Sequence, residues 1–202
     1  MEKSYGLSGR NQLTVEKMAN DEIPPGWDYN PASWSQRMPI IVLAIIGFLI
    51  AAYLSLYQFG ILSAVWEPFF GNGSITILNS PISHALPIPD AALGAFGYLV
   101  DAVAGAVGGT KRWKTMPWIV VFFGIAIGPL GFVSVMLVVF QPVLFDAWCT
   151  LCLVTAVISV VMIGPSMDEV LASMQYLKRI KQSGKSLWRG FWGYKDVIDK
   201  VN

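Results

Sequence analysis

The chain is poor in charged residues: of its 202 residues, 13% are Asp, Glu, Lys or Arg, whereas 54% are hydrophobic. A soluble domain carries about a quarter charged residues, so this composition excludes an ordinary soluble globular protein, and its hydrophobicity excludes a disordered chain. The formal net charge of +1 gives no basic surface for nucleic acid. Two cysteines are too few for a disulfide framework. These absences leave a small integral membrane protein.

Lysine and arginine are also missing from one long stretch, residues 38–110. Four apolar runs avoid the basic residues, at 39–62, 91–108, 117–145 and 148–164. A helix needs about 20 apolar residues to cross the hydrocarbon core of a bilayer, and the second and fourth runs are close to the short limit. We therefore predict an all-α membrane protein, a four-transmembrane-helix bundle in which lipid surrounds the runs.

The basic residues predict the orientation of this bundle. They gather in the N-terminal tail, in the 111–114 segment and in the C-terminal tail, whereas the 66–90 loop has none. Cytoplasmic loops of membrane proteins carry the excess of Lys and Arg. Four crossings with both termini cytoplasmic satisfy this rule in every loop, and they place the 66–90 loop and the Asp146–Ala147 turn outside.

Three parts of the chain follow from this topology: a cytoplasmic N-terminal tail (1–38), a membrane domain (39–164) and a cytoplasmic C-terminal segment (165–202). Apolar residues recur at helical spacing between 167 and 180, and basic residues follow them. This pattern predicts an amphipathic helix on the inner membrane surface. The aromatic segment 187–192 either lies in the membrane interface or docks on a partner protein.

Both cysteines lie in one motif, Cys149-Thr-Leu-Cys152. On a helix this spacing places two sulfurs one turn apart on one face, where either a disulfide or a dithiol is available. The predicted topology puts Cys149 in the first turn of the last span, on the outer side where disulfides persist. Asp146 precedes it at the expected N-cap position.

Other uses of the two cysteines are open. Zinc would require two more ligands, and the only histidine is His84, so we expect no metal site. The cysteines could also pack as small apolar side chains without redox chemistry. A redox pair that faces a membrane-soluble electron carrier is the interpretation that the location favours.

Two acidic residues belong to the second run, one at its start and one within it. Asp90 stands at its start and is predicted to be the helix N-cap. Asp101 stands three turns further along, where an acid is costly in a membrane and usually faces the bundle interior. It lies either in that interior or near the inner interface beside Lys111 or Arg112.

These features resemble the vitamin K epoxide reductase family of membrane thiol oxidoreductases. The resemblance covers residues 39–164 and rests on four spans with both ends cytoplasmic, Cys149 and Cys152 at the outer end of the last span, a long outer loop that ends in Ser80, and the Asp90-Ala-Ala-Leu-Gly94…Tyr98 start of the second span. Such members have a four-helix bundle around a quinone site and lie in the bacterial inner membrane.

The resemblance implies roles for particular residues. Cys152 would face the quinone, and Cys149 would exchange disulfides on the outer side, with an extracytoplasmic thioredoxin-like protein as a partner. Asp90 falls where some members use an Asn to hydrogen-bond a quinone carbonyl. The outer loop would cover this end of the bundle and contribute its remaining quinone-site residues, namely Phe69, Phe70 and Ser80.

The sequence departs from the family pattern in the outer loop. Typical members carry a second cysteine pair there, and by spacing Trp66 and Ser74 stand near those positions. A quinone-contacting tyrosine of the family falls on Ala156. Two hypotheses therefore remain: a quinone-linked thiol–disulfide oxidoreductase, or a redox-inactive member that serves as an accessory subunit of a larger membrane complex. A transporter fits less well, because Asp101 is the only acid within a span.

Overall fold

The computed structural model describes residues 22–84 and 87–194, and this part of the chain is helical with no strands. Most of the predicted N-terminal tail and the end of the C-terminal segment lie outside the described residues. The helices are α2 (Trp34–Gln58), α3 (Gly73–Leu78), α4 (Asp90–Ala106), α5 (Arg112–Thr115), α6 (Pro117–Phe145), α7 (Thr150–Gln182) and α8 (Leu187–Phe191). The prediction of an all-helical protein is therefore confirmed for the described residues.

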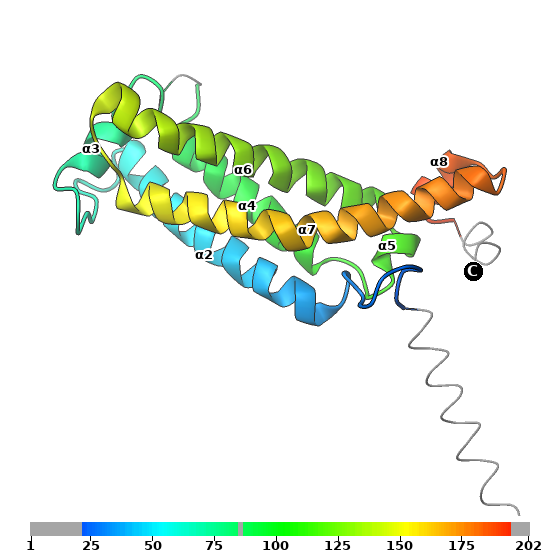
Figure 1. Ribbon diagram of the computed structural model, residues 1–202. Helices are drawn as coiled ribbons and strands as arrows, with labels where there is room; N and C mark the ends of the chain where they lie inside the picture. The colour runs from blue at the N-terminus through cyan, green and yellow to red at the C-terminus, as the bar shows by residue number, and fades with distance from the viewer. Residues whose placement is uncertain (1–21, 85–86, 195–202) are drawn as a thin grey trace, which may run out of the picture.

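Four long helices lie side by side, with α3 at one end of the bundle and α5 and α8 at the other (Figure 1). Among the described residues α2, α6 and α7 are long and apolar enough to cross a membrane. Only 28–33% of each spanning window is buried inside the protein, so most of these apolar side chains face outward, as lipid requires. The fourth long helix, α4, has 17 residues.

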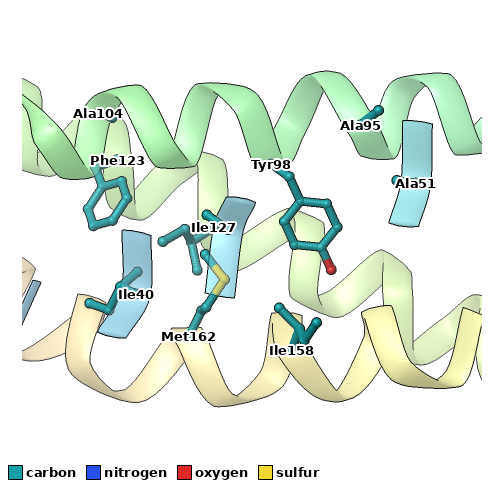
Figure 2. Close-up of a cluster of buried hydrophobic side chains, with 10 residues drawn as sticks. Ile40, Ala51, Ala95, Tyr98, Ala104, Phe123, Ile127, Ile158 and Met162 are labelled. Atoms are coloured by element: carbon teal, nitrogen blue, oxygen red, sulfur yellow. The ribbon is translucent and has the colours of Figure 1, made fainter. Parts of the chain in front are cut away.

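The core of the bundle is built from small and large residues that fit together. Tyr98 of α4 is 2% exposed, and its ring points toward α7, next to Ile158 (Figure 2). Gly47 of α2 lies against this ring, and a Cβ at Gly47 would come within 2.6 Å of it. The glycine therefore allows α2 and α4 to approach closely around the tyrosine.

Two buried arginines fasten the end of the bundle that carries α5. Arg112 forms a bidentate ion pair with Glu169 of α7, and both side chains are at most 1% exposed. Arg37 of α2 donates to the carbonyls of Gly105 and Val107, at the C-terminus of α4, and Arg112 also donates to the carbonyl of Val107. The positive charges thus satisfy the last carbonyls of α4, where the helix dipole is negative.

Asp101 lies in the interior of the bundle rather than at the inner interface. Its side chain is 1% exposed, and neither carboxylate oxygen has a hydrogen-bond partner among the described residues. Of the two placements that the sequence left open, the structure has the buried one.

The last run and the amphipathic segment after it form a single helix. α7 has 33 residues and continues through Pro165, and no break separates the span from the segment at 167–180. Residues 22–33 pack against its far half: Tyr29 donates to Asp168, and Trp27 donates to Gln175. The end of the N-terminal tail is therefore attached to α7.

Candidate redox site

The cysteine pair lies at the junction of α6 and α7, at the bundle end that carries α3 (Figure 1). Cys149 and Cys152 form a disulfide, with their Cα atoms 5.2 Å apart. Cys149 is 0% exposed, whereas Cys152 is partly exposed. The two sulfurs therefore have different access: one is enclosed, and the other borders open space.

The helix cap at this junction differs from the sequence prediction. Asp146 is not the N-cap of α7; it ends α6 with a φ of 47°, in the left-handed conformation that Asp tolerates better than most residues. The N-cap is Cys149, and its sulfur accepts a hydrogen bond from the backbone N–H of Cys152 at 3.2 Å. The chain reverses direction at Asp146, directly after α6, so this residue does not cap α7. The N-cap position falls three residues later, at Cys149.

Glu67 of the loop between α2 and α4 binds the N-terminus of α7. Its carboxylate accepts hydrogen bonds from the backbone N–H and the hydroxyl of Thr150, the residue after Cys149, and from the hydroxyl of Ser74. It also accepts from the backbone N–H groups of Phe69 and Phe70, both at 3.3 Å. One side chain thus ties the loop to itself and to the cysteine turn.

These contacts also shift the ionisation of Glu67. Burial raises the pKa of this carboxyl, but the hydrogen bonds from Ser74, Thr150 and Phe69 outweigh it and lower the pKa from 4.5 to about 2. Glu67 is therefore ionised at neutral pH. The negative charge of Glu67 lies at the helix end that carries the disulfide. It therefore disfavours the formation of another negative charge at this place.

The short helix α3 covers Cys149. Gly73 at its start lies so close to the carbonyl oxygen of Trp148 that a Cβ there would overlap it. The rings of Phe70 and Trp148 are 6.3 Å apart, and Ser74 is 0% exposed. The loop therefore lies directly on the cysteine turn and closes Cys149 off from solvent.

A cavity of about 90 Å³ opens among α2, α4, α6 and α7, and Cys152 is part of its wall. Its polar lining includes Asp90, Gln141 and Ser134, and the remainder is mostly apolar. A second cavity of about 50 Å³ lies next to it and is lined by Ser80 as well as by Asp90, Gln141 and Cys152. Cys152 and Asp90 thus line the same two cavities.

Asp90 is held by a compact hydrogen-bond network. Its Oδ1 accepts from Gln58 Nε2 and Ser83 Oγ, both at 2.7 Å, and from the backbone N–H of Ala91 at 2.8 Å. Asp90 is not the N-cap of α4, as the sequence had predicted, but its first helical residue, because Pro89 takes the N-cap position. Its carboxylate lies at the positive end of the helix dipole.

Gln141 connects the two halves of the site. Its Oε1 accepts a hydrogen bond from the backbone N–H of Cys149 at 3.0 Å, and the residue lines both cavities. Its amide nitrogen makes no hydrogen bond within the part of the chain that the structure describes. It is therefore a donor available to a ligand in the cavity.

The structure brings some of the predicted site residues together and separates others. Cys152, Asp90 and Ser80 border the paired cavities. Phe69 and Phe70 line neither of them, and Phe69 is 77% exposed. The two phenylalanines thus lie outside both cavities, and their contribution to a quinone site stays a prediction.

Sequence reasoning missed Gln58, Ser83 and Gln141. The two glutamines carried a signal, since an amide within an apolar run is costly in lipid and usually faces a partner or a cavity. Ser83 gave no comparable signal.

Deeper in the bundle, Tyr98 donates to the carbonyl of Thr155 and shares a hydrogen bond with Ser159, both at 2.6 Å. The described residues contain no cluster of three His, Cys, Asp or Glu side chains that could hold a metal ion.

Comparison with known proteins places the chain in a family. The model of the vitamin K epoxide reductase family matches residues 38–166, which is more than half of the chain and includes both cysteines. No curated protein and no solved structure matches the chain.

Proposed function

The chain belongs to the vitamin K epoxide reductase family, and from that premise we propose that it is a quinone-linked thiol–disulfide oxidoreductase of the membrane. In this proposal Cys149 and Cys152 carry electrons between an extracytoplasmic dithiol or disulfide and a quinone. The observation that carries it is the position of Cys152, bonded to the enclosed Cys149 on one side and open to a partly polar cavity on the other.

The proposal includes a topology. α4 is the fourth span, because its 17 residues extend over about 26 Å, close to the thickness of the hydrocarbon core. The described ends of the chain lie together near α5, as an even number of crossings requires: Trp113 donates to the carbonyl of Glu22, and Gly193 lies against Thr115. The basic residues gather at this end, so the positive-inside rule places it in the cytoplasm and the cysteines outside.

The cavity suits a quinone headgroup. Its walls are mostly apolar, and the amide nitrogen of Gln141 is a donor for a carbonyl oxygen. Asp90, as a carboxylate, is only an acceptor, so its proposed contribution is to hold Gln58 and Ser83 in place rather than to donate to the carbonyl. A bound quinone supplies the site with an acceptor for two electrons and two protons.

The thiol chemistry can be written for these two sulfurs. An external thiolate attacks Cys149, forms a mixed disulfide and releases Cys152 as a thiolate; the second external thiol then resolves the mixed disulfide and leaves the internal pair reduced. When Cys149 and Cys152 form their disulfide again, the dithiol gives up two electrons and two protons, which leave toward the cavity next to Cys152. Because Cys149 is 0% exposed, the first step requires the loop held by Glu67 to move.

A second candidate function rests on the same loop. Ser74 stands near a family cysteine position, and here it is fully buried and hydrogen-bonded to Glu67. Hydrogen bonds thus hold this part of the loop in place, where typical family members carry a cysteine that exchanges disulfides. This arrangement suits a redox-inactive member that serves as an accessory subunit of a larger membrane complex.

Thiol trapping in native membranes tests the two candidates. The protein is reduced, the reductant is removed, a soluble quinone analogue is added, and the free thiols are counted by a mass-tagged maleimide over time. We expect quinone to remove both thiols, and Cys152→Ser to leave the Cys149 thiol untouched by quinone.

Gln141→Leu gives the sharper variant, because it keeps both cysteines. We expect it to slow the quinone-driven loss of thiols at least tenfold, the effect of losing a hydrogen bond worth about 1.4 kcal/mol. Gln36→Leu, at an exposed position on α2, is the matched control and should react at the normal rate. If quinone leaves the thiols of the unaltered protein unchanged, the oxidoreductase proposal fails. Co-purification of a partner that survives Cys149→Ser would then favour the accessory role.

A further inference from the structure

α8 and the last turns of α7 lie at the opposite end of the molecule from α3 (Figure 1). A groove lies between them. Its volume is about 530 Å³, and it is lined by Met174, Leu177, Lys178, Lys181, Leu187, Trp188 and Phe191. The five apolar residues form its walls, and the two lysines are its only charged residues. No acidic side chain lines it.

Neighbouring residues place this groove at the membrane boundary. Trp192, directly after α8, packs against Trp118 in the first turn of α6, with ring centroids 5.7 Å apart. α6 has 29 residues and extends over about 43 Å, close to the thickness of a bilayer with its headgroups. Tryptophans are enriched at this boundary. α8 therefore lies at the level of the lipid headgroups.

The groove also continues a lipid-facing surface. Met167, Leu171 and Met174 are exposed on α7, by 38%, 49% and 55%, and their spacing places them along one face of the helix. Lys178 and Lys181 extend the same face by two turns. The ammonium groups of the two lysines therefore lie beyond the end of this apolar face, where the headgroup of a lipid with its acyl chain on the face would lie.

The positive charge of the groove indicates which kind of ligand fits it. Lys178 and Lys181 are three residues apart, so their side chains are neighbours on the helix surface. Neither is paired with a carboxylate within the described chain. Arg179, between them, donates to the carbonyl of Pro25 and is committed to the N-terminal segment. Two adjacent cations above an apolar groove complement a phosphate group above an acyl chain.

We propose that this groove is a binding site for an anionic glycerophospholipid. The phosphate lies between Lys178 and Lys181, and an acyl chain packs on Met174, Leu187 and Phe191. Trp188, 68% exposed, closes the side of the groove toward the headgroup. The site would fasten α7 and α8 to the membrane surface, and it does not depend on the redox function proposed above.

Native mass spectrometry of the full chain in detergent tests the proposal. Phosphatidylglycerol and phosphatidylcholine with identical acyl chains are added in turn, and the bound fraction is measured for the unaltered protein and for Lys178→Gln/Lys181→Gln. Both lipids carry a phosphate, but the choline ammonium of phosphatidylcholine cancels its charge and repels the two lysines. We therefore expect phosphatidylglycerol to bind at least tenfold more tightly than phosphatidylcholine, since each lysine near an anionic headgroup contributes about a fivefold preference. The double variant should lose this preference.

Lys111→Gln is the matched control, because it removes a charge near the same end of the bundle but outside the groove. It should retain the preference, and Leu187→Ala should weaken the binding of both lipids. Equal binding of the two lipids, or a preference that survives the double substitution, would overturn the proposal. Displacement by millimolar inorganic phosphate alone would do the same, because it indicates an anion site without a lipid. Unchanged melting of the variants ensures that folding is not the cause.

Discussion

Replacing Glu67 with alanine should release the loop between α2 and α4 from α7 and give reagents access to Cys149. Two hydrogen bonds join Glu67 to Thr150, one to the backbone N–H at 2.9 Å and one to the hydroxyl. A hydrogen bond to a charged group contributes about 1.5–3 kcal/mol, and the partial exposure of Glu67 reduces this. For the pair together we take about 2–3 kcal/mol, which corresponds to a rise in the open fraction of about 30-fold to 160-fold.

The assay is the rate at which a maleimide labels Cys149 at neutral pH in a Cys152→Ser background, where it is the only thiol. Glu67→Ala should raise this rate by about the factor above, and Glu67→Gln, which keeps one acceptor oxygen, should give a smaller rise. Thr76→Val is the control, because its hydroxyl bonds only to Asn72 within the same loop. A labelling rate that changes less than threefold in Glu67→Ala would refute the assignment of Glu67 as the fastening residue.

The same residue predicts a dependence on pH. The pKa of Glu67 is lowered in the folded protein from 4.5 to about 2, because its hydrogen bonds outweigh its burial. The ionised carboxylate therefore stabilises the closed loop fully above about pH 4.5, and this stability is lost as the pH falls through 2. A phosphine should reduce the disulfide faster at pH 3 than at pH 6 in the unaltered protein, with a weaker dependence in Glu67→Gln.

Three further substitutions test the packing by thermal unfolding in detergent. Arg112→Gln should lower the stability by about 3–5 kcal/mol, because it leaves Glu169 buried without its ion-pair partner; a loss below 1 kcal/mol would contradict this. Asp101→Leu should raise the stability by about 1–3 kcal/mol, since it removes a buried carboxylate without a partner among the described residues. Gly73→Ala should destabilise by about 1–3 kcal/mol, because its Cβ overlaps the carbonyl of Trp148; an unchanged melting temperature would show that the loop adjusts freely.

The sequence predicted those features that depend on local pattern. Apolar runs without charge predicted the long helices, and the spacing of Cys149 and Cys152 predicted a pair of sulfurs within bonding distance. The resemblance implied that Cys152 and Asp90 belong to one quinone site; both residues line the same cavity, and their roles toward a quinone stay a prediction. The resemblance to a family, drawn from these residues, agrees with the match over residues 38–166.

Helix ends were less predictable. Asp146 has the chemistry of an N-cap, but the reversal after α6 requires a residue with positive φ, and Asp146 fills that position. Cysteine is not a usual cap, so nothing in the sequence indicated that Cys149 would take the role. The sequence pattern predicted the last run and the amphipathic segment after it as separate elements, but α7 continues through Pro165, because one missing N–H is tolerated within a long packed helix.

The amino-acid sequence by itself determined that this protein is helical, that it belongs in a membrane and that its two cysteines lie in one motif, because hydropathy, charge and short spacing are local properties. Only the tertiary structure decided which sulfur is enclosed and which borders a cavity. Glu67 reaches Thr150 across 83 positions of the chain, and Gln58 reaches Asp90 across 32. Such contacts depend on how the helices pack, and the local sequence around one residue does not indicate which distant residue it will contact.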